Sequence, residues 1–402
     1  MKKLLFITSS FPYGEGESFI KPEIEYLGRF HELTVIPTYP RGKLRNDVNY
    51  DSTYNSKLSL FSLYYCIGFI RFCFTKPLKL FKLLKLCKGK LFIKTIRNII
   101  LLPKAVFISK VLCKEKNYDF IYCHWLSAPS QLSLLISTLT NIPFGITAHR
   151  WDLIDDNNTL HKLSSCSFLR LISKKSCELL DKDLYLNNVN KISVIYMGVD
   201  IKRLIVPEFR CRQQTFHGVC VASLIDVKGH KVLLDSISIL KANGFQCKIS
   251  IIGDGYLRDE LVKLTNDLDI CNEVTFLGSL NHLDVLDLIS SKQVNFMCLP
   301  SLDLGEGLHE GVPVSLMEAM GSGLPCISTN TGSIGELIKH KNNGILVDQE
   351  NSTQLADAIY ELYSNQDLYN SIAINSVETI KYKFNAYRNN GSLNELIKNN
   401  IK

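Results

Sequence analysis

Two glutamates lie eight positions apart around the start of a predicted helix in the second half of the sequence. Glu310 stands before the helix and Glu318 within it, and between them come Gly311, Val312, Pro313 and Val314. Proline suits the first position of a helix, because the amide that it lacks would have no partner there. The remaining free amides and the helix dipole favour an anion or a polar sugar. A pair of solvated surface glutamates is the alternative.

A lysine and several glycines follow predicted strands of the same half. Lys228 lies between a strand and a helix, where its ammonium group would be placed to neutralise a diphosphate. Gly253, Gly255 and Gly278 come at strand ends, where glycine lets the backbone approach a nucleobase and its phosphates closely. Each feature alone is common in ordinary turns. Their shared placement at strand ends favours a binding site.

The first half carries two histidines after predicted strands. His149 follows one strand, with Asp152 three positions later, and His124 follows another. A lone histidine at such a position is more often a packing or capping residue than a reactive one. A glycine-bearing loop that includes Gly14 and Gly16 follows the first strand, and its amides could bind an anion.

Short apolar runs alternate with helical stretches along the chain, which is typical of parallel α/β sheets. In the first half we expect strands at 3–8, 33–37, 120–124, 144–147, 169–173 and 192–196. In the second half we expect them at 218–223, 248–253, 273–277, 294–299, 326–329 and 344–347. Helices are expected at 230–242, 257–267, 314–321 and 353–363, with a helical tail from 377 that is broken at 389–391. The pattern predicts an α/β protein of two doubly wound, Rossmann-like domains facing a central cleft, with ligands at the carboxyl ends of the strands.

The composition fits a globular protein of two domains. The chain has 402 residues, of which 46% are hydrophobic and 21% charged, and this length suffices for more than one core. Its 13 cysteines are scattered and include no C-x-x-C pair, so we expect reduced thiols in the cytoplasm. The first apolar run, at 4–7, is too short for a secretory signal, and no run reaches the roughly 18 residues of a membrane span.

Positive charge is concentrated in one segment. Residues 57–116 contain 14 lysines and arginines and one acidic residue, so their net charge is 14 − 1 = +13, within a chain of net charge +7. A helix over 76–91 would place four lysines on one side and, on the other, Leu80, Phe81, Leu83, Leu84 and Cys87. Such a helix could lie on an anionic bilayer. An ordinary domain helix is the alternative, and no nucleic-acid motif accompanies the charge.

Taken in order, the motifs between residues 140 and 350 resemble the retaining glycosyltransferases of family 4, which have the two-domain GT-B fold. The resembling pieces are Thr147-Ala148-His149-x-x-Asp152, Gly198-Val199-Asp200, Val221-Ala222-Ser223-Leu224 with Lys228-Gly229, Gly253-Asp254-Gly255, Phe276-Leu277-Gly278, Pro300-Ser301, Glu310-x7-Glu318-Ala319-Met320 and Gly332 to Glu336. One piece alone would be weak evidence, whereas eight pieces in the family's order are specific.

The resemblance implies a role for each donor-binding residue. Glu310 would contact the transferred sugar, Glu318 the ribose hydroxyls, and Lys228 the diphosphate. Ser223 stands where the family commonly has an arginine, so the phosphate site would have one cation fewer. The other donor-binding residues implied are Gly14, Gly16, Gly253, Gly278, Gly311, Val312, Pro313 and Val314.

For the other side of the reaction, the resemblance puts His149 beside the reacting sugar, so that His149, Glu310 and Lys228 are the expected catalytic residues. His124 and Asp152 would lie on the acceptor side. No metal ion or other cofactor is implied. Two D-x-D pairs, at 181–183 and 267–269, are expected at the surface as solvated charge.

The domains implied are an acceptor-binding domain over 1–203, a nucleotide-sugar-binding domain over 204–380, and a helical tail over 381–402 that returns toward the first domain. The activity implied is transfer of a sugar, with retention, from a nucleotide-diphosphate donor to a lipid-linked glycan in a bacterial surface polysaccharide such as O-antigen or capsule. Such an enzyme would work at the inner face of the plasma membrane, without binding nucleic acid. Two alternatives stay open: a catalytically impaired GT-B protein that binds nucleotide sugar or acts as a scaffold, which Ser223 supports, and a sugar-nucleotide epimerase.

Overall fold

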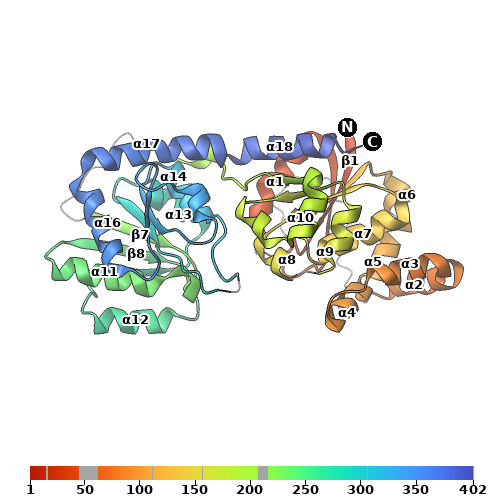
Figure 1. Ribbon diagram of the computed structural model, residues 1–402, viewed down its shortest axis with the longest axis horizontal. Coiled ribbons are helices and arrows are strands. Elements are labelled where there is room, and N and C mark those ends of the chain that lie inside the picture. Colours follow the sequence, from red (N-terminus) through yellow and green to blue (C-terminus); the bar gives the residue numbers. More distant parts are fainter. Residues whose placement is uncertain are drawn as a thin grey trace. The chain divides into compact units, whose positions relative to one another are not determined.

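The computed structural model describes residues 1–14, 17–44, 62–110, 112–155, 157–206, 216–305 and 307–401. Met1–Tyr196 together with Tyr387–Lys402 form one compact unit, here called unit 1, and Met197–Ala386 form unit 2. The border after Tyr196 comes earlier than the expected 203, because Val199 forms a β-bridge with Asn385 and so ties this segment to unit 2. Each unit is built on one parallel sheet with helices on both faces (Figure 1).

The sheet of unit 1 has six strands in the order β2-β1-β3-β4-β5-β6. The strands are β1 (Lys2–Thr8), β2 (His31–Pro37), β3 (Phe120–His124), β4 (Phe144–Ala148), β5 (Phe168–Leu171) and β6 (Ile192–Val194). The helices are α1 (Lys21–Leu27), α2 (Leu63–Thr75), α3 (Pro77–Leu86), α4 (Phe92–Ile100), α5 (Leu102–Lys110), α6 (Leu112–Lys116), α7 (Ala128–Thr140), α8 (Arg150–Asp155), α9 (Thr159–Ser165), α10 (Lys182–Asn188) and α18 (Ala386–Lys398).

The sheet of unit 2 has six strands in the order β12-β11-β10-β7-β8-β9. The strands are β7 (Phe216–Val221), β8 (Cys247–Ile252), β9 (Val274–Gly278), β10 (Phe296–Leu299), β11 (Cys326–Thr329) and β12 (Ile345–Val347). The helices are α11 (His230–Ala242), α12 (Arg258–Asp267), α13 (His282–Ser290), α14 (Val314–Gly321), α15 (Ile334–Leu337), α16 (Ser352–Ser364) and α17 (Gln366–Lys383). All twelve expected strands and all four expected helices are present, with ends that differ by a few residues.

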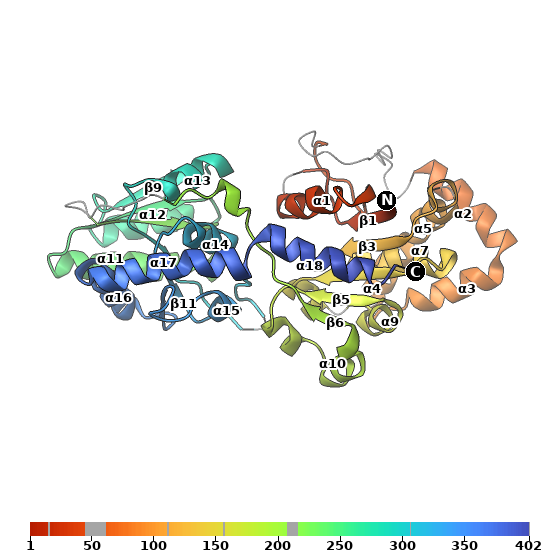
Figure 2. The ribbon, with the colours of Figure 1, turned by 90° about the horizontal axis from the view of Figure 1, so that it is seen from above.

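The core of unit 1 lies on both faces of its sheet. Successive side chains of a strand point to opposite faces, so Leu4 and Phe6 enter one buried cluster while Leu5 and Ile7 enter another. The first cluster includes Leu393 of α18, which lies over the sheet together with α1 (Figure 2). Because both faces are covered, the strands are apolar throughout, and this is why their apolar runs could be recognised in the sequence.

The C-terminal helices differ from the expectation at one point. The helix break lies at Phe384 and Asn385, between α17 and α18, whereas residues 389–391 continue the helix. Here the expected break at 389–391 is wrong. Asn390 donates a hydrogen bond to the carbonyl of Pro22, and a Cβ at Gly391 would lie 3.1 Å from the hydroxyl of Tyr26. Small and polar residues at this point therefore serve the close contact between α18 and α1.

Five helices, α2 to α6, connect β2 with β3, and α2 and α3 lie side by side at the periphery of unit 1 (Figures 1 and 2). The helix expected over 76–91 is shorter in the structure, where α3 ends at Leu86, and its expected apolar side is only partly buried. Leu83 and Cys87 are fully buried in the core of unit 1, whereas Phe81 and Leu84 are exposed. The helix thus divides its apolar residues between the core and the surface. Within the described residues, no helix has the length and apolar character needed to cross a membrane.

The two sheets share a packing device in which a phenylalanine ring lies over a glycine of the neighbouring strand. Gly145 of β4 is in register with Phe168 of β5, and Gly218 of β7 is in register with Phe296 of β10. A Cβ on Gly218 would lie 2.3 Å from Cζ of Phe296. Phe296 also stacks on Phe216, with ring centroids 5.0 Å apart. The missing side chain of the glycine therefore makes room for the ring.

We predict that Gly218→Ala lowers the thermal unfolding midpoint of the protein, because the new methyl group displaces the Phe296 ring at a cost of about 1–3 kcal/mol. Adding Phe296→Leu should recover part of the loss. Gly68→Ala in α2, where a Cβ would meet nothing within 4 Å, is the control and should leave the midpoint unchanged or raise it. Equal midpoints for Gly218→Ala and the wild-type protein would contradict this account of the packing.

Candidate active site

The predicted donor-binding residues of unit 2 gather at the carboxyl edge of its sheet. The first strand of this unit, β7, has β8 on one side and β10 on the other, so the direction of strand succession reverses between β7 and β10. In doubly wound sheets, ligands bind at such a reversal. Lys228 follows β7 and Glu310 follows β10, and the two side chains form a partly buried ion pair. The structure therefore brings these two predicted residues together.

Tight turns bring the loops after β7, β8 and β9 against one another. The amide of Gly253 donates a hydrogen bond to the carbonyl of Gly278, with N and O 2.9 Å apart. Gly253 has a φ of +140°, and a Cβ there would lie 2.0 Å from the carbonyl oxygen of Ala222. Ser223, next in the chain, is exposed. Ser223, Gly253 and Gly278 therefore share the carboxyl edge, as expected from the sequence.

Helix α14 begins at Val314, and Pro313 occupies the preceding N-cap position with φ −65° and ψ 128°. Pro313 is therefore not the first helical residue, as the sequence had suggested, but the last extended one. Gly311 and Val312 are partly buried between Glu310 and this proline. The start of α14 carries no side-chain cap within the described residues. Its amides are thus suited to an anion or a sugar hydroxyl.

Glu318 lies on α14 with a buried side chain. Its Oε1 is 2.6 Å from Nε2 of His282, and this contact raises the pKa of the histidine. The second carboxylate oxygen, Oε2, has no hydrogen bond among the described residues. His282 was not identified from the sequence, and neither was the helix that it begins. The available signal was the pair Asn281 and Asp284, a helix-start pattern in which Asn281 accepts a hydrogen bond from the amide of Asp284.

In unit 1, His149 belongs to a buried set of hydrogen-bonded polar groups. Its Nε2 is 2.6 Å from Nε2 of His124, whose Nδ1 is 3.3 Å from Oε1 of Glu23. Glu23 also accepts hydrogen bonds from the Tyr122 hydroxyl, at 2.9 Å, and from Nη1 of Arg170, at 2.5 Å. The side chains of His124, Glu23 and Arg170 are 1% exposed or less. Four separate elements, α1, β3, β5 and the segment after β4, supply these groups.

The charges of this set are balanced inside the protein. Burial alone would raise the pKa of Glu23, but the Arg170 guanidinium and His124 lower it to about 2. Glu23 is therefore an ionised carboxylate at neutral pH. Burial lowers the pKa of His149 well below its ordinary value, and the positive charge of the nearby Arg170 acts in the same direction. The His149 imidazole is therefore neutral.

Sequence reasoning missed Glu23 and Arg170. Nothing in the local sequence marks Glu23. Arg170 did carry a signal, because a charged residue inside an apolar strand must find a partner when both faces of the sheet are buried.

The loop after β1 is held by Glu17. Its carboxylate accepts hydrogen bonds from the amides of Ser10 and Phe11, each at 2.6 Å, and from Nε1 of Trp125. Trp125 has a φ of +89°, a strained conformation for a tryptophan, and its ring centroid lies 4.4 Å from that of His149. Glu17 thus joins the loops after β1 and β3 across the reversal point of the first sheet, beside His149.

The structure departs from several expectations for unit 1. The amide of Gly14 donates to the carbonyl of Lys43, at 2.9 Å, and is therefore not available to a phosphate. Gly16 lies outside the described residues. His124 is fully buried behind His149 and does not line a surface. Asp152 is buried, which raises its pKa, and it accepts a hydrogen bond from the backbone amide of His149 rather than from the ring.

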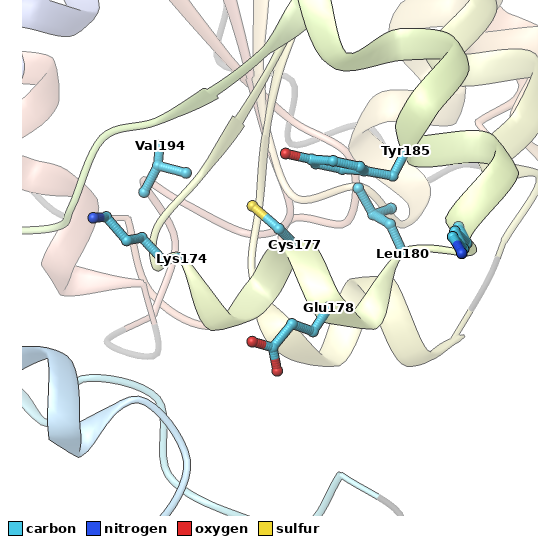
Figure 3. Close-up of a pocket in the computed structure, with 7 residues that line it drawn as sticks. Lys174, Cys177, Glu178, Leu180, Tyr185 and Val194 are labelled. Carbon is cyan, nitrogen blue, oxygen red and sulfur yellow. The ribbon is translucent and has the colours of Figure 1, made fainter.

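Two further features lie away from these residues. Of the D-x-D pairs, Asp181 caps α10 by accepting hydrogen bonds from the amides of residues 183 and 184. In the part of the chain that the structure describes, no cluster of three or more His, Cys, Asp or Glu could hold a metal ion. A pocket of unit 1 contains none of the predicted site residues (Figure 3), and its lining is Lys174, Cys177, Glu178, Leu180, Lys182, Tyr185 and Val194.

Residues 212–379 match the family model described as Glycosyl transferases group 1. Over 208 residues the chain is 29% identical to the putative colanic acid biosynthesis glycosyltransferase WcaL of Salmonella typhimurium, covering 52% of this chain and 51% of the relative. It is 24% identical over 307 residues to the UDP-Gal:alpha-D-GlcNAc-diphosphoundecaprenol alpha-1,3-galactosyltransferase of Escherichia coli, covering 70% of this chain and 74% of the relative.

Among solved structures, a glycosyltransferase of Rickettsia africae matches 99% of this chain and 99% of its own, with a TM-score of 0.70 and 18% identity. The likeness extends over both sheets, and the matched family covers the part of unit 2 that carries Lys228, Glu310 and Glu318. The chain therefore has the two Rossmann-like sheets of the GT-B fold, and residues 212–379 of unit 2 are similar to the glycosyl transferases group 1.

Proposed function

We propose that this glycosyltransferase moves a sugar, with retention, from a nucleotide-diphosphate donor to a lipid-linked glycan during the synthesis of a bacterial surface polysaccharide. The observation that carries the proposal is the ion pair of Lys228 and Glu310 at the reversal point of the second sheet, with Glu318 on the helix that follows Glu310. The names of two relatives support the polysaccharide, the donor and the acceptor in this proposal. The relative from Salmonella typhimurium is named for colanic acid biosynthesis. The relative from Escherichia coli is named for UDP-Gal and a diphosphoundecaprenol-linked acceptor.

In this proposal the donor replaces the ion pair between Lys228 and Glu310. The ammonium group moves to the diphosphate, whose charge grows as the glycosidic bond breaks, and the carboxylate accepts hydrogen bonds from the transferred sugar. Oε2 of Glu318 accepts from the ribose hydroxyls, while Oε1 keeps its contact with His282. The departing phosphate takes the proton of the acceptor hydroxyl on the same face of the sugar. Catalysis is then mainly positioning and stabilisation of leaving-group charge, without a protein nucleophile, metal or cofactor.

We expect one class among UDP-, GDP- and ADP-sugars to raise the thermal unfolding midpoint of the purified protein. Glu318→Ala should weaken that donor by about 10- to 100-fold, because hydrogen bonds to a charged group contribute about 1.5–3 kcal/mol. Asp357→Ala, at an exposed position of α16, is the control and should bind the donor normally. If no donor class shifts the wild-type protein, the donor site is refuted and the scaffold alternative gains.

Lys228→Met should lower kcat for sugar transfer by about 10²–10³-fold, because it removes a charge that stabilises the departing diphosphate. The assay would use the donor identified by thermal shift and undecaprenyl-diphosphate-linked N-acetylglucosamine as acceptor. Lys231→Met is the matched control, since Lys231 lies three residues further and pairs at the surface with Glu260. Loss of activity in both variants, or in neither, would argue against a special role for Lys228.

We also propose that unit 1 docks on an anionic bilayer through α2, α3 and α4, which would present the enzyme to a lipid-linked acceptor. One side of α2 faces the core of unit 1 with the buried Tyr65 and Phe72. The opposite side carries large apolar residues at helical spacing, and each is more than half exposed: Leu63, Ile67, Ile70 and Phe74. Further exposed apolar residues follow on α3 and α4, among them Leu78, Phe81, Phe92 and Ile93.

The charge around these helices complements a membrane of anionic lipids. Residues 62–110 contain eleven lysines and arginines and no aspartate or glutamate. The ammonium group of Lys85 lies 4.7 Å above the ring of Phe81, so cationic and apolar groups are interleaved on the same surface. Each cation near an anionic bilayer contributes about 1 kcal/mol, and the exposed apolar side chains can enter the interface. Nucleic-acid binding would use the cationic groups but would not explain the apolar stripe, which is the row of exposed apolar residues on α2.

We predict that the protein sediments with phosphatidylglycerol-rich vesicles at low salt and much less with phosphatidylcholine vesicles. Ile67→Glu/Phe74→Glu should weaken binding by about 100-fold or more, because burial of each large apolar side chain contributes about 1.5–3 kcal/mol. Ile374→Glu, at an exposed position of α17 in unit 2, is the control and should bind like the wild type. If the stripe variant binds vesicles normally, or if the stripe instead mediates a concentration-dependent dimer, the membrane surface is assigned wrongly.

A further inference from the structure

Four side chains of unit 1 form a continuous hydrogen-bonded series from a buried guanidinium to the surface-proximal His149. Nη1 of Arg170 contacts Oε2 of Glu23 at 2.5 Å, and Oε1 of Glu23 contacts Nδ1 of His124 at 3.3 Å. Nε2 of His124 contacts Nε2 of His149 at 2.6 Å. Only His149 of this series is not fully buried. The series therefore links the inside of the unit to one imidazole that a ligand could reach.

The hydrogen-bond chemistry gives this series a direction. An ionised carboxylate can only accept, so Glu23 requires a proton on Nδ1 of His124. The charge of Glu23 is already balanced by Arg170, and a second cation in the same dry pocket would be costly. With His124 uncharged, the proton on Nδ1 is its only ring proton, and its Nε2 carries none. Nε2 of His124 must then accept from Nε2–H of His149. Because the His149 ring is neutral, its Nδ1 is left as a bare acceptor.

The other groups around His149 leave that Nδ1 unoccupied. Asp152 of α8 accepts from the backbone amide of His149, at 3.2 Å. Glu17 accepts a hydrogen bond from the Trp125 ring, whose centroid lies 4.4 Å from the centroid of the His149 imidazole. Among the described residues, His149 makes no side-chain hydrogen bond besides the one to His124. Its second nitrogen is therefore available to a ligand.

We propose that Glu23 and His124 are positioning residues that hold His149 with Nε2 protonated, so that its Nδ1 accepts a hydrogen bond from a donating hydroxyl of the carbohydrate substrate. The catalytic consequence rests on the proposed function, whereas the proton arrangement does not. A buried ion pair is an expensive way to stabilise a fold, because well-packed apolar residues do so at least as well. Its use here is to impose one tautomer on a histidine two hydrogen bonds away. No covalent step is involved, and no proton leaves the series.

The test is the tautomer of His149, read from the ¹⁵N chemical shifts and long-range ¹H–¹⁵N couplings of histidine-labelled protein. In the wild type we expect His149 with Nε2 protonated and Nδ1 bare. Glu23→Gln should invert the series. Arg170 must face the amide oxygen of the new side chain, so the amide NH2 group points to Nδ1 of His124 and donates to it. His124 then carries its proton on Nε2, and His149 carries its proton on Nδ1.

The control is Glu25→Gln, a change of the same kind on the same helix, where Glu25 pairs with Lys21 at the surface. It should leave the His149 spectrum unchanged. A wild-type His149 with Nδ1 protonated would overturn the proposal, even if Glu23→Gln failed to fold. An unchanged His149 tautomer in a folded Glu23→Gln protein would overturn the link to Glu23.

The catalytic consequence has a separate readout. Glu23→Gln should lower kcat of sugar transfer about tenfold, because the hydroxyl loses its acceptor, while the thermal shift by the nucleotide sugar stays as in the wild type. An inverted tautomer with unchanged kcat would overturn the assignment of Nδ1 to a substrate hydroxyl. A wild-type protein that transfers no sugar would refute the proposed function, and the NMR result would still decide the proton arrangement.

Discussion

Both units depend on one topological constraint, which is that the first strand of each parallel sheet lies inside the sheet and not at its edge. β1 has β2 and β3 as neighbours, and β7 has β8 and β10. The later strands are therefore added on both sides of the first strand, and the connecting segments leave the first strand in opposite directions. Glu17 and Trp125 follow the strands on the two sides of this point in unit 1, and Lys228 and Glu310 do so in unit 2. Residues far apart in the chain meet there because every parallel strand ends at the same edge.

The two sheets reach close packing by similar means, and unit 1 in addition buries charged side chains. In each, a glycine leaves room for a phenylalanine of the adjacent strand, as Gly145 does for Phe168 and Gly218 for Phe296. Unit 1 also buries Arg170 with Glu23 and buries Lys104, whose ammonium group donates to the carbonyls of residues 37 and 38. Burial lowers the pKa of Lys104 to about 7. A paired guanidinium stays charged in the interior, whereas a lysine that meets only carbonyls moves toward its neutral form.

The ion pairs of the two candidate sites differ in their exposure. Lys228 with Glu310, and His282 with Glu318, each have at least one partner in contact with solvent, so a ligand can compete for them. The pair of Arg170 with Glu23 is closed to solvent, and no ligand can reach it. The accessible ion pairs of unit 2 can therefore exchange partners when the donor binds. The buried pair of Arg170 with Glu23 keeps its partners and can only hold neighbouring side chains in place. Burial therefore separates the groups that can touch substrate from those that can only act through a neighbour.

Much of the candidate donor site could be predicted from the sequence because its residues sit in short local motifs. Lys228, Glu310 and Glu318 are marked by a strand before them or a helix around them, and a parallel sheet puts such strand ends at one edge. Glu23 could not be found in this way. It lies in an ordinary first turn of a helix, and its partner Arg170 is 147 positions away. Only packing decides which distant side chains share a buried pocket.

The sequence by itself determined the twelve strands and the parallel α/β class, because strands buried on both faces leave continuous apolar runs. It also determined that basic and apolar residues gather between β2 and β3. The tertiary structure alone decided which apolar residues of that segment face the core, since Leu83 and Phe81 are both apolar but Leu83 is buried in the core of unit 1 and Phe81 is exposed. It likewise decided the proton arrangement of His149, because a tautomer is set by hydrogen-bond partners, and these come from elements that only folding brings together.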